Sequence, residues 1–209
     1  QGGRWVEGED RFLVSLRPST LELGTVDITQ APAQYEQITF TGGNKINPFA
    51  WWAPEYGEPV FSAMLLKRGR HQIGIFRRTS EDPNSWELFN TLEIPSENYP
   101  LVSSPEAFVA NGRSYIVTVS ASELGGEEFK FQPKGPSEIW IAGIDPDNPF
   151  YRRIDDPSIP FPDQPQRSEP EVYYTADGPI VYYTELLEDE FGEKIRLVRR
   201  AQTGLGTEY

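Results

Sequence analysis

The chain has no cysteine and a single histidine, His71, among its 209 residues. The lack of cysteine excludes disulfides, thiolate catalysis and zinc sites built on thiolates. One histidine excludes any centre that needs two imidazole ligands, although a structural calcium site made only of oxygen ligands is left open. The sequence therefore predicts no cofactor, and any chemistry has to come from carboxylates, hydroxyls, amides and aromatic rings.

Two further shortages limit the partners of this chain. No stretch approaches the roughly 18 uncharged apolar residues that a membrane-spanning helix needs, so no membrane span is expected. Basic residues are outnumbered, 19 against 32 acidic ones, for a formal charge of -13. Such a chain repels phosphate backbones, and nucleic acid is not an expected partner. We expect the arginine pairs Arg77-Arg78, Arg152-Arg153 and Arg199-Arg200 to lie on solvated strand faces or to pair with neighbouring carboxylates rather than to form a basic patch.

The start of the chain carries no signal peptide, and its first residue is Gln1 instead of methionine. This is expected of a processed or truncated chain, and removal of a secretory peptide is one way to produce it. We therefore predict an extracytoplasmic location, secreted or periplasmic. The sequence makes no prediction of the oligomeric state.

A sustained helical period is also missing, and 19 prolines with 18 glycines punctuate the sequence. Short runs rich in aromatic and β-branched residues recur instead, which is typical of strands. Asn111-Gly112 and Asp177-Gly178 predict tight hairpins, because such turns need positive φ. The hairpin around Trp5 and Phe12 matches the one around Phe108 and Tyr115. The sequence predicts an all-β fold.

A proline followed by glutamate occurs three times, and each glutamate lies twenty residues after an aromatic side chain. The three pairs are Tyr35 and Glu55, Trp86 and Glu106, and Tyr151 and Glu171. A phase kept over that distance indicates an internal structural repeat.

Each repeat contains about four short antiparallel strands, and the chain holds about four repeats. Their approximate bounds are 1–42, 43–95, 96–160 and 161–209. Repeated four-stranded units are typical of a β-propeller, whereas a β-sandwich does not require a fixed repeat. We predict one propeller domain over 1–209, either a four-bladed ring or a part or relative of a five-bladed one.

In a propeller the first strands line a central channel, so equivalent positions converge at its mouth. This predicts Glu55, Glu106 and Glu171 around one opening, with Glu169 close by. Glycoside hydrolysis needs two carboxylates on opposite sides of the scissile bond. Aromatic residues near the opening are candidates to stack on sugar rings. They are Trp51, Trp52, Tyr56 and Tyr173. Adjacent strand residues face opposite ways, so one of Trp51 and Trp52 has to leave the core and is the better ligand platform.

Segments 104–122 and 78–86 resemble the blades of five-bladed propeller glycosidases, the arabinanases, β-xylosidases and fructosidase-like enzymes of glycoside hydrolase family 43 and its relatives. The resemblance implies an acid on the first strand of each of three blades, and by position these are Glu55, Glu106 and Glu171. From the convergence of these acids with nearby aromatic residues, we hypothesise catalysis by Glu106 and Glu171 with Glu55 as modulator, on an oligo- or polysaccharide. The first repeat has Gly3 at this position, and no matching position carries aspartate.

Two functions are left open. The first is a carbohydrate-active propeller that acts as a glycoside hydrolase through these carboxylates. The second is a non-catalytic propeller that binds a glycan or a protein, in which the repeated glutamates accept backbone N–H bonds or pair with arginines of the next blade.

Overall fold

The computed structural model describes residues 4–5, 11–16, 22–67, 70–78, 86–125, 132–188 and 191–206. All regular elements within these ranges are β-strands. The chain divides into two compact units, residues 1–93 and 94–209. Each unit contains two antiparallel sheets, which we call blades 1 to 4 in chain order. The single domain predicted over 1–209 stays a prediction.

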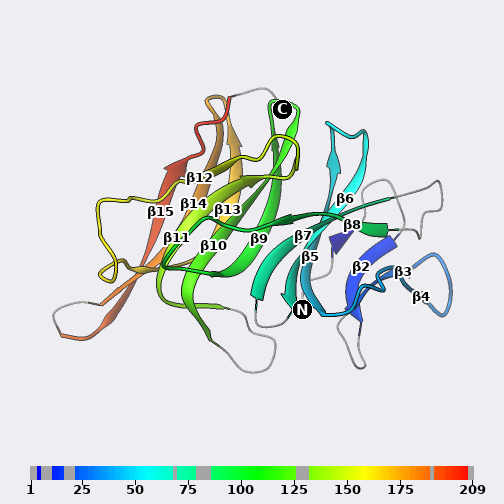
Figure 1. Ribbon diagram of the computed structural model, residues 1–209, viewed down its shortest axis with the longest axis horizontal. Helices are drawn as coiled ribbons and strands as arrows, with labels where there is room; N and C mark the ends of the chain where they lie inside the picture. Colours follow the sequence, from blue (N-terminus) through cyan, green and yellow to red (C-terminus); the bar gives the residue numbers. More distant parts are fainter. Residues whose placement is uncertain are drawn as a thin grey trace. The chain divides into compact units, whose positions relative to one another are not determined.

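Unit 1 holds blades 1 and 2, each with four described strands in sequential order (Figure 1). Blade 1 consists of β1 (Arg4–Trp5), β2 (Arg11–Leu16), β3 (Glu22–Asp27) and β4 (Gln34–Gln37). Blade 2 consists of β5 (Asn44–Ala53), β6 (Glu58–Lys67), β7 (Arg70–Arg78) and β8 (Trp86–Leu92).

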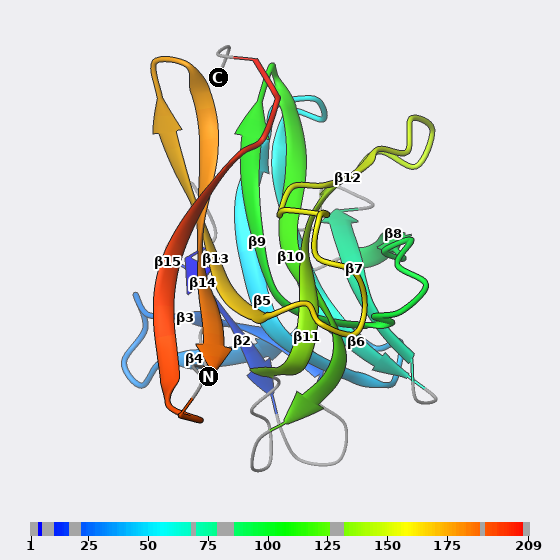
Figure 2. The same cartoon turned by 90° about the vertical axis from the view of Figure 1, so that its left-hand side faces the viewer.

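Unit 2 holds blade 3, with four described strands, and blade 4, with three. Blade 3 consists of β9 (Leu101–Ala110), β10 (Arg113–Gly125), β11 (Gln132–Gly143) and β12 (Tyr151–Arg153). Blade 4 consists of β13 (Gln166–Thr175), β14 (Gly178–Glu188) and β15 (Lys194–Gln202). Figure 2 shows the three strands of blade 4 beside strands β9, β10 and β11 of blade 3.

The predicted hairpins form where the sequence placed them. Asn111 and Gly112 both have positive φ, 51° and 65°, and connect β9 to β10. In the corresponding hairpin of blade 4, Gly178 has positive φ, 104°, but Asp177 does not, so the turn residues are Ala176 and Asp177 and the glycine follows them. The matched pairs are also confirmed, since Trp5 lies opposite Phe12 and Phe108 opposite Tyr115. The sequence also predicts turns over 7–10 and 79–85, and both ranges lie outside the described residues.

Within each unit, the two blades pack through a shared apolar cluster. In unit 1 the cluster joins Leu23 and Ile38 of blade 1 to Phe61, Phe76 and Trp86 of blade 2. The Phe61 ring lies 4.7 Å from that of Phe76 and 4.8 Å from that of Trp86, between centroids. The sequence predicts that Trp86, at a strand position, packs between blades, and this cluster confirms it. In unit 2 the cluster joins residues of β9, β10 and β11 to residues of β14 and β15. It contains Phe108, Ala110, Tyr115, Val117, Val119, Ile139, Ile141, Val181, Tyr183 and Ala201.

The first strands of blades 2, 3 and 4 share one irregularity. In each, two residues lie opposite a single residue of the second strand, which makes a β-bulge. The first bulge residue has positive φ: 50° at Asn47, 49° at Ser104 and 54° at Glu169. The second is a proline in every case, Pro48, Pro105 or Pro170. Proline suits this place because an unpaired bulge residue donates no ladder hydrogen bond.

The bulges correct one predicted alignment. Glu106 and Glu171 directly follow their bulges, but the residue that follows the bulge of blade 2 is Phe49. Glu55 lies instead in the turn Pro54–Gly57 after β5. The reason is that the connection leading to the bulge of blade 2 is six residues shorter than the connections leading to the bulges of blades 3 and 4. The bulge proline lies thirteen positions after Tyr35 in blade 2, but nineteen positions after the equivalent aromatic residue in blades 3 and 4. Glu55 of the dipeptide Pro54-Glu55 therefore lies twenty residues after Tyr35 by coincidence, and not because it is equivalent to Glu106 and Glu171.

The backbone of the bulge gives a stability prediction. A non-glycine residue in the left-handed region costs on the order of 1 kcal/mol, and glycine avoids most of this cost. We expect Ser104→Gly to raise the free energy of unfolding by roughly 0.5–1 kcal/mol, which is about 1–4 °C in Tm for a chain of this size. Ser168→Gly, one residue before the bulge of blade 4, is the control and should lower Tm. A lower Tm in both variants would contradict the strain at Ser104.

Candidate functional site

Glu106 and Glu171 occupy equivalent positions on the first strands of blades 3 and 4. Glu106 lies opposite Val117 and is partly buried, whereas Glu171 lies opposite Tyr182 and is exposed. The two strands are neighbours, because the hydroxyl of Tyr174 on β13 accepts the N–H of Val109 on β9 at 3.0 Å. The fold of unit 2 therefore places two of the three predicted catalytic residues at equivalent positions of neighbouring strands.

The surroundings of Glu171 are aromatic and polar. Tyr173 packs edge-on against Tyr182 with 5.2 Å between ring centroids, and Tyr173 is 55 % exposed. Glu169, which the sequence placed near the opening, accepts a hydrogen bond from Thr184 at 3.3 Å and lies 3.9 Å from Arg196. Exposed rings beside carboxylates give both stacking surfaces and hydrogen-bond acceptors for a sugar.

The other predicted site residues belong to unit 1. Trp51 is 8 % exposed and Trp52 is 44 % exposed, which confirms that one of the two indoles leaves the core. Tyr56 lies in the same turn as Glu55, and the guanidinium of Arg77 covers its ring at 3.8 Å from the centroid. Tyr56 also meets the Phe89 ring edge-on at 5.4 Å. One face of Tyr56 is thus occupied by its own blade.

Sequence reasoning missed a buried ion pair that joins blades 1 and 2. Lys45 on β5 is 1 % exposed, and its ammonium lies 2.6 Å from Glu22 on β3. Glu22 also accepts hydrogen bonds from the Thr39 hydroxyl at 2.6 Å and the Gly42 N–H at 2.8 Å. Burying two charges is favourable only when they are paired and hydrogen-bonded, as they are here.

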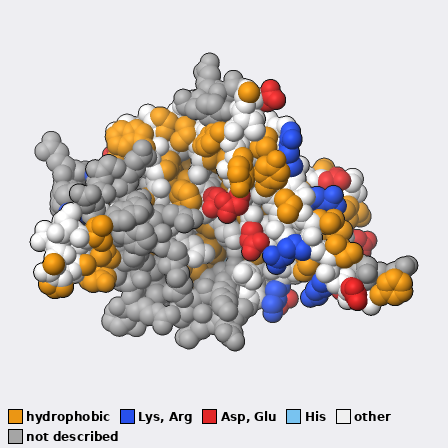
Figure 3. All heavy atoms as spheres, turned by 180° about the vertical axis from the view of Figure 1, so that it is seen from behind, with side chains coloured by type: hydrophobic (Ala, Val, Ile, Leu, Met, Phe, Trp, Pro, Cys, Tyr) orange, Lys and Arg blue, Asp and Glu red, His pale blue; other side chains and the backbone are white. Residues whose placement is uncertain are grey.

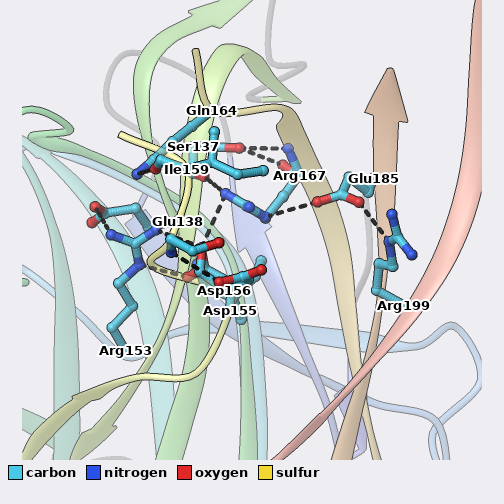
Figure 4. Close-up of polar contacts among 12 residues, drawn as sticks. Ser137, Glu138, Arg153, Asp155, Asp156, Ile159, Gln164, Arg167, Glu185 and Arg199 are labelled. Atoms are coloured by element: carbon cyan, nitrogen blue, oxygen red, sulfur yellow. Dashed lines mark hydrogen bonds and ion pairs between the residues drawn. The ribbon is translucent and has the colours of Figure 1, made fainter. Parts of the chain in front are cut away.

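A larger network joins blades 3 and 4 in the same way (Figure 4). The guanidinium of Arg167 on β13 is fully buried between two carboxylates, 3.0 Å from Asp155 and 3.4 Å from Glu185. Arg153 binds Asp155 at 2.7 Å, and Arg199 binds Glu185 at 2.6 Å. Blade 4 thus inserts a cation into an acidic socket formed partly by blade 3.

The two ion-pair networks have the same arrangement, with residues at equivalent positions of the blades. Lys45 and Arg167 both lie three residues before the bulge proline of their strand. Thr39 and Asp155 also correspond, because each accepts the N–H of an apolar residue on the third strand, Leu23 or Ile139, at 2.9 Å. A basic residue three positions before the proline is the sequence signal. In blade 3 that position holds the apolar, buried Val102.

The prediction for the arginine pairs is confirmed. One arginine of each pair binds a carboxylate: Arg77 binds Glu58, Arg153 binds Asp155 and Arg199 binds Glu185. In the view of Figure 3, described basic and acidic side chains lie interspersed among apolar ones. The basic residues around His71 predict an exposed loop for it, but His71 lies in strand β7, and burial lowers its pKa.

The carboxyl of Glu22 gives a pH prediction. Burial acts to raise its pKa, but hydrogen bonds from Lys45, Thr39 and Gly42 outweigh burial and hold it below the ordinary value of 4.5. A carboxyl whose pKa is lowered by folding stabilises the fold above its unfolded pKa, and this stabilisation is lost as the pH falls through the folded pKa. We expect the free energy of unfolding to decline below about pH 4.5 and Glu22→Gln to flatten that decline.

Urea unfolding between about pH 3 and 7 measures this effect. Glu87→Gln removes an exposed carboxylate of the same unit and is the control, which should leave the pH dependence unchanged. Equal pH profiles for Glu22→Gln and the unaltered chain would contradict the assignment.

Unit 2 also contains two cavities near the network. One of about 440 Å³ is bounded by the chain after β12 and by strands β14 and β15. Its lining residues are Ile154, Asp155, Asp156, Ile159, Tyr183, Glu185, Arg199, Arg200 and Ala201. The second, of about 490 Å³, lies along Gly135–Pro136, Ile159, 163–166 and the far end of the hairpin of β14 and β15.

The turn Asp145–Asn148 closes as an ordinary turn, in which the Asp145 carboxylate accepts the Asp147 N–H at 3.0 Å. No group of three acidic or histidine side chains in the described ranges is placed to hold a metal ion. No described helix has the length and apolar character to span a membrane.

Comparison with known proteins identifies the fold. No family model and no curated protein matches the chain. A crystal structure of an endo-arabinase from Bacteroides thetaiotaomicron VPI-5482 superimposes with a TM-score of 0.53 at 11 % identity, over 91 % of this chain and 74 % of the other. At this identity the likeness shows the fold alone. The chain has the all-β, β-propeller fold of four-stranded antiparallel blades that its sequence predicted.

Proposed function

We propose that this chain is a carbohydrate-active propeller that hydrolyses glycosidic bonds, with Glu106 and Glu171 as its pair of carboxylates. The observation that carries the proposal is their placement directly after the same bulge on neighbouring first strands. Two carboxylates are the minimum that glycoside hydrolysis needs, one to protonate the leaving oxygen and one to act as base or nucleophile. The likeness in fold to an endo-arabinase supports the proposal.

The roles divide by environment. Glu171 is exposed to solvent and is suited to activate a water molecule, and Glu106 is partly buried and is suited to donate the proton. Tyr173 and Tyr182 offer ring faces and edges beside Glu171 for a sugar unit. Trp52, the exposed indole of its pair, keeps the predicted role of ligand platform.

The substrate that we propose is a neutral polysaccharide of the arabinan type. The net charge of -13 disfavours an anionic polymer such as a polyuronide. An extracytoplasmic location, which we also propose, would give access to such a polymer. Incubation with linear arabinan, a neutral β-glucan and polygalacturonate, followed by assay of new reducing ends, tests both the activity and the preference. No release from any polymer would overturn the hydrolase proposal.

The second candidate function is a non-catalytic glycan-binding module. It is favoured by Phe49, which stands where a third acid would lie, and by Gly3 at the matching position of the first repeat. Binding of arabinan without cleavage, measured by calorimetry on the unaltered chain, would identify this function.

A further inference from the structure

The hydroxyl of Tyr174 links the two strands that carry the proposed catalytic carboxylates. It accepts the main-chain N–H of Val109 at 3.0 Å and so joins β13 to β9 (Figure 1). Val109 lies three residues after Glu106, and Tyr174 lies three residues after Glu171. The bond therefore connects equivalent points of the two first strands, each about 10 Å along its strand from the carboxylate.

Strand alternation explains why Tyr174 and not Tyr173 makes this bond. Adjacent strand residues face opposite sides of a sheet. Val172, on the same face as Tyr174, packs on the apolar cluster that blade 4 shares with blade 3. Tyr173 lies on the other face, where its ring meets that of Tyr182. Tyr174 is thus directed toward blade 3, and Tyr173 is directed away from it.

The N–H of Val109 needs a partner of this kind. Among the described strands β9 pairs with β10 alone, so its other edge has main-chain groups without a strand partner. Val109 is partly buried, and a buried N–H that forms no hydrogen bond costs free energy. The tyrosine hydroxyl of the next blade supplies the acceptor. A phenylalanine at position 174 would keep the ring but could not accept the bond.

At its other end, β13 is attached to blade 3 by the buried Ser137. The Ser137 hydroxyl accepts the N–H of Arg167 at 2.5 Å and donates to the Arg167 carbonyl at 3.1 Å. Glu171 lies between the two attachments, four residues after Arg167 and three before Tyr174. Loss of the tyrosine bond would therefore loosen the half of β13 that follows Glu171.

Glu106 is fixed within blade 3 by its own bulge. Thr118 lies opposite the bulge, is fully buried, and donates its hydroxyl to the carbonyl of Ser103 at 2.8 Å. Blades 2 and 4 have Ala63 and Tyr183 at the equivalent position. The spacing between the two carboxylates therefore depends on how β13 lies against β9, which is where the bond of the tyrosine acts.

We propose that Tyr174 is a positioning residue of the hydrolytic site, and that its hydroxyl sets the spacing of Glu106 and Glu171 by attaching β13 to β9. This inference rests on the proposed hydrolysis by these two carboxylates. Their spacing decides whether one of them attacks the sugar directly or activates a water molecule that lies between them. A displacement of about 1 Å is enough to cost on the order of 100-fold in rate. Tyr174 acts through the two strands and needs no contact with the substrate.

Tyr174→Phe removes the hydroxyl and keeps the ring. Hydrogen exchange followed by NMR should show the Val109 amide exchanging roughly two- to tenfold faster, as expected for the loss of one hydrogen bond. On arabinan, kcat should fall by about tenfold with KM within about twofold, because the substrate still binds but the reacting groups are misplaced. Tyr115→Phe, which removes a hydroxyl from a buried tyrosine on β10 of the same unit, is the control and should change neither quantity.

The Glu106→Gln background separates positioning from a general defect of the fold. Where Tyr174 acts by placing the carboxyl of Glu106, its hydroxyl has little further effect once that carboxyl is absent. Tyr174→Phe should therefore lower kcat by less than about twofold in this background. A general defect of the fold would lower kcat by the same factor in both backgrounds and would overturn the inference.

Three other results would also overturn it. An unchanged exchange rate at Val109 would show that the bond does not hold β9, and an unchanged kcat in Tyr174→Phe would show that the bond does not place the carboxylates. An increase in KM alone would assign the hydroxyl to substrate binding. These results require an active parent for the kinetic part. Absence of hydrolysis by the unaltered chain would overturn the proposed function, and this role with it, whatever the exchange rate shows.

Discussion

Glu106→Gln and Glu171→Gln should each lower kcat on linear arabinan by at least about 100-fold, because general acid–base catalysis contributes roughly 10²–10⁴-fold and an amide cannot transfer the proton. Binding of arabinan should persist in both variants, since the amide is isosteric with the carboxyl. Release of reducing ends gives kcat, and calorimetry gives the dissociation constant. A loss of kcat with retained binding separates catalysis by these residues from a fold defect.

Two further variants sharpen this test. Glu97→Gln removes an exposed carboxylate of the same unit outside the first strands and should keep full activity. Glu55→Gln measures the modulating role predicted for that residue, which lies in the turn after β5. A loss comparable with that of Glu106→Gln would place Glu55 in the same site, and retention of activity would limit the chemistry to the two bulge carboxylates.

Substrates with different leaving groups assign the roles. An aryl glycoside with a good leaving group needs little protonation, so Glu106→Gln should lose far less activity on it than on arabinan if Glu106 is the acid. Glu171→Gln should be equally impaired on both substrates. The reverse pattern would exchange the two roles, and unchanged activity in both variants would contradict the proposed pair.

Local features were the most predictable part of this fold. The hairpins at Asn111-Gly112 and after Thr175 follow from the conformational freedom of glycine and asparagine, and the strand pairs Trp5–Phe12 and Phe108–Tyr115 follow from alternation around those hairpins. Similarly, adjacent indoles cannot both enter one core, so the different exposure of Trp51 and Trp52 is a consequence of strand geometry.

The predicted equivalence of Glu55 with Glu106 and Glu171 was wrong because the length of a connection between blades can vary, whereas strand pairing fixes the positions of residues within a blade. Six residues fewer between β4 and the next bulge moved Phe49 into the position predicted for Glu55. The pattern that is constant is structural, a residue with positive φ before proline. Asn47, Ser104 and Glu169 have no common side-chain chemistry, so a comparison of residue types does not find them.

The interblade ion pairs were missed because they depend on contacts between blades. Glu22 and Lys45 are 23 positions apart, and Glu185 lies 18 positions after Arg167. Nothing in local periodicity indicates that these side chains are buried. The signal was present as Lys or Arg three residues before a bulge proline, but only the structure shows that the proline marks a bulge.

Arg167→Met should lower the free energy of unfolding of unit 2 by roughly 3 kcal/mol, because the carboxylates of Asp155 and Glu185 lose their fully buried cation. They keep only the more exposed guanidinium groups of Arg153 and Arg199 as partners. Arg200→Met removes an exposed guanidinium that makes no contact with the described charged groups, and its effect should stay within about 0.5 kcal/mol. Urea unfolding measures both changes, and hydrogen exchange at β11 and β13 shows whether the loss lies in unit 2.

The size of the effect depends on charge and on geometry, and Arg167→Lys separates the two. Lysine keeps the positive charge, as Lys45 does at the equivalent place in unit 1, but one ammonium cannot reach Asp155 and Glu185 with the planar fork of a guanidinium. We expect Arg167→Lys to lose about half as much stability as Arg167→Met. Equal losses would mean that bidentate geometry, and not neutralisation of buried charge, holds the two blades together. A loss below about 0.5 kcal/mol in Arg167→Met would show that water reaches the socket when the cation is removed.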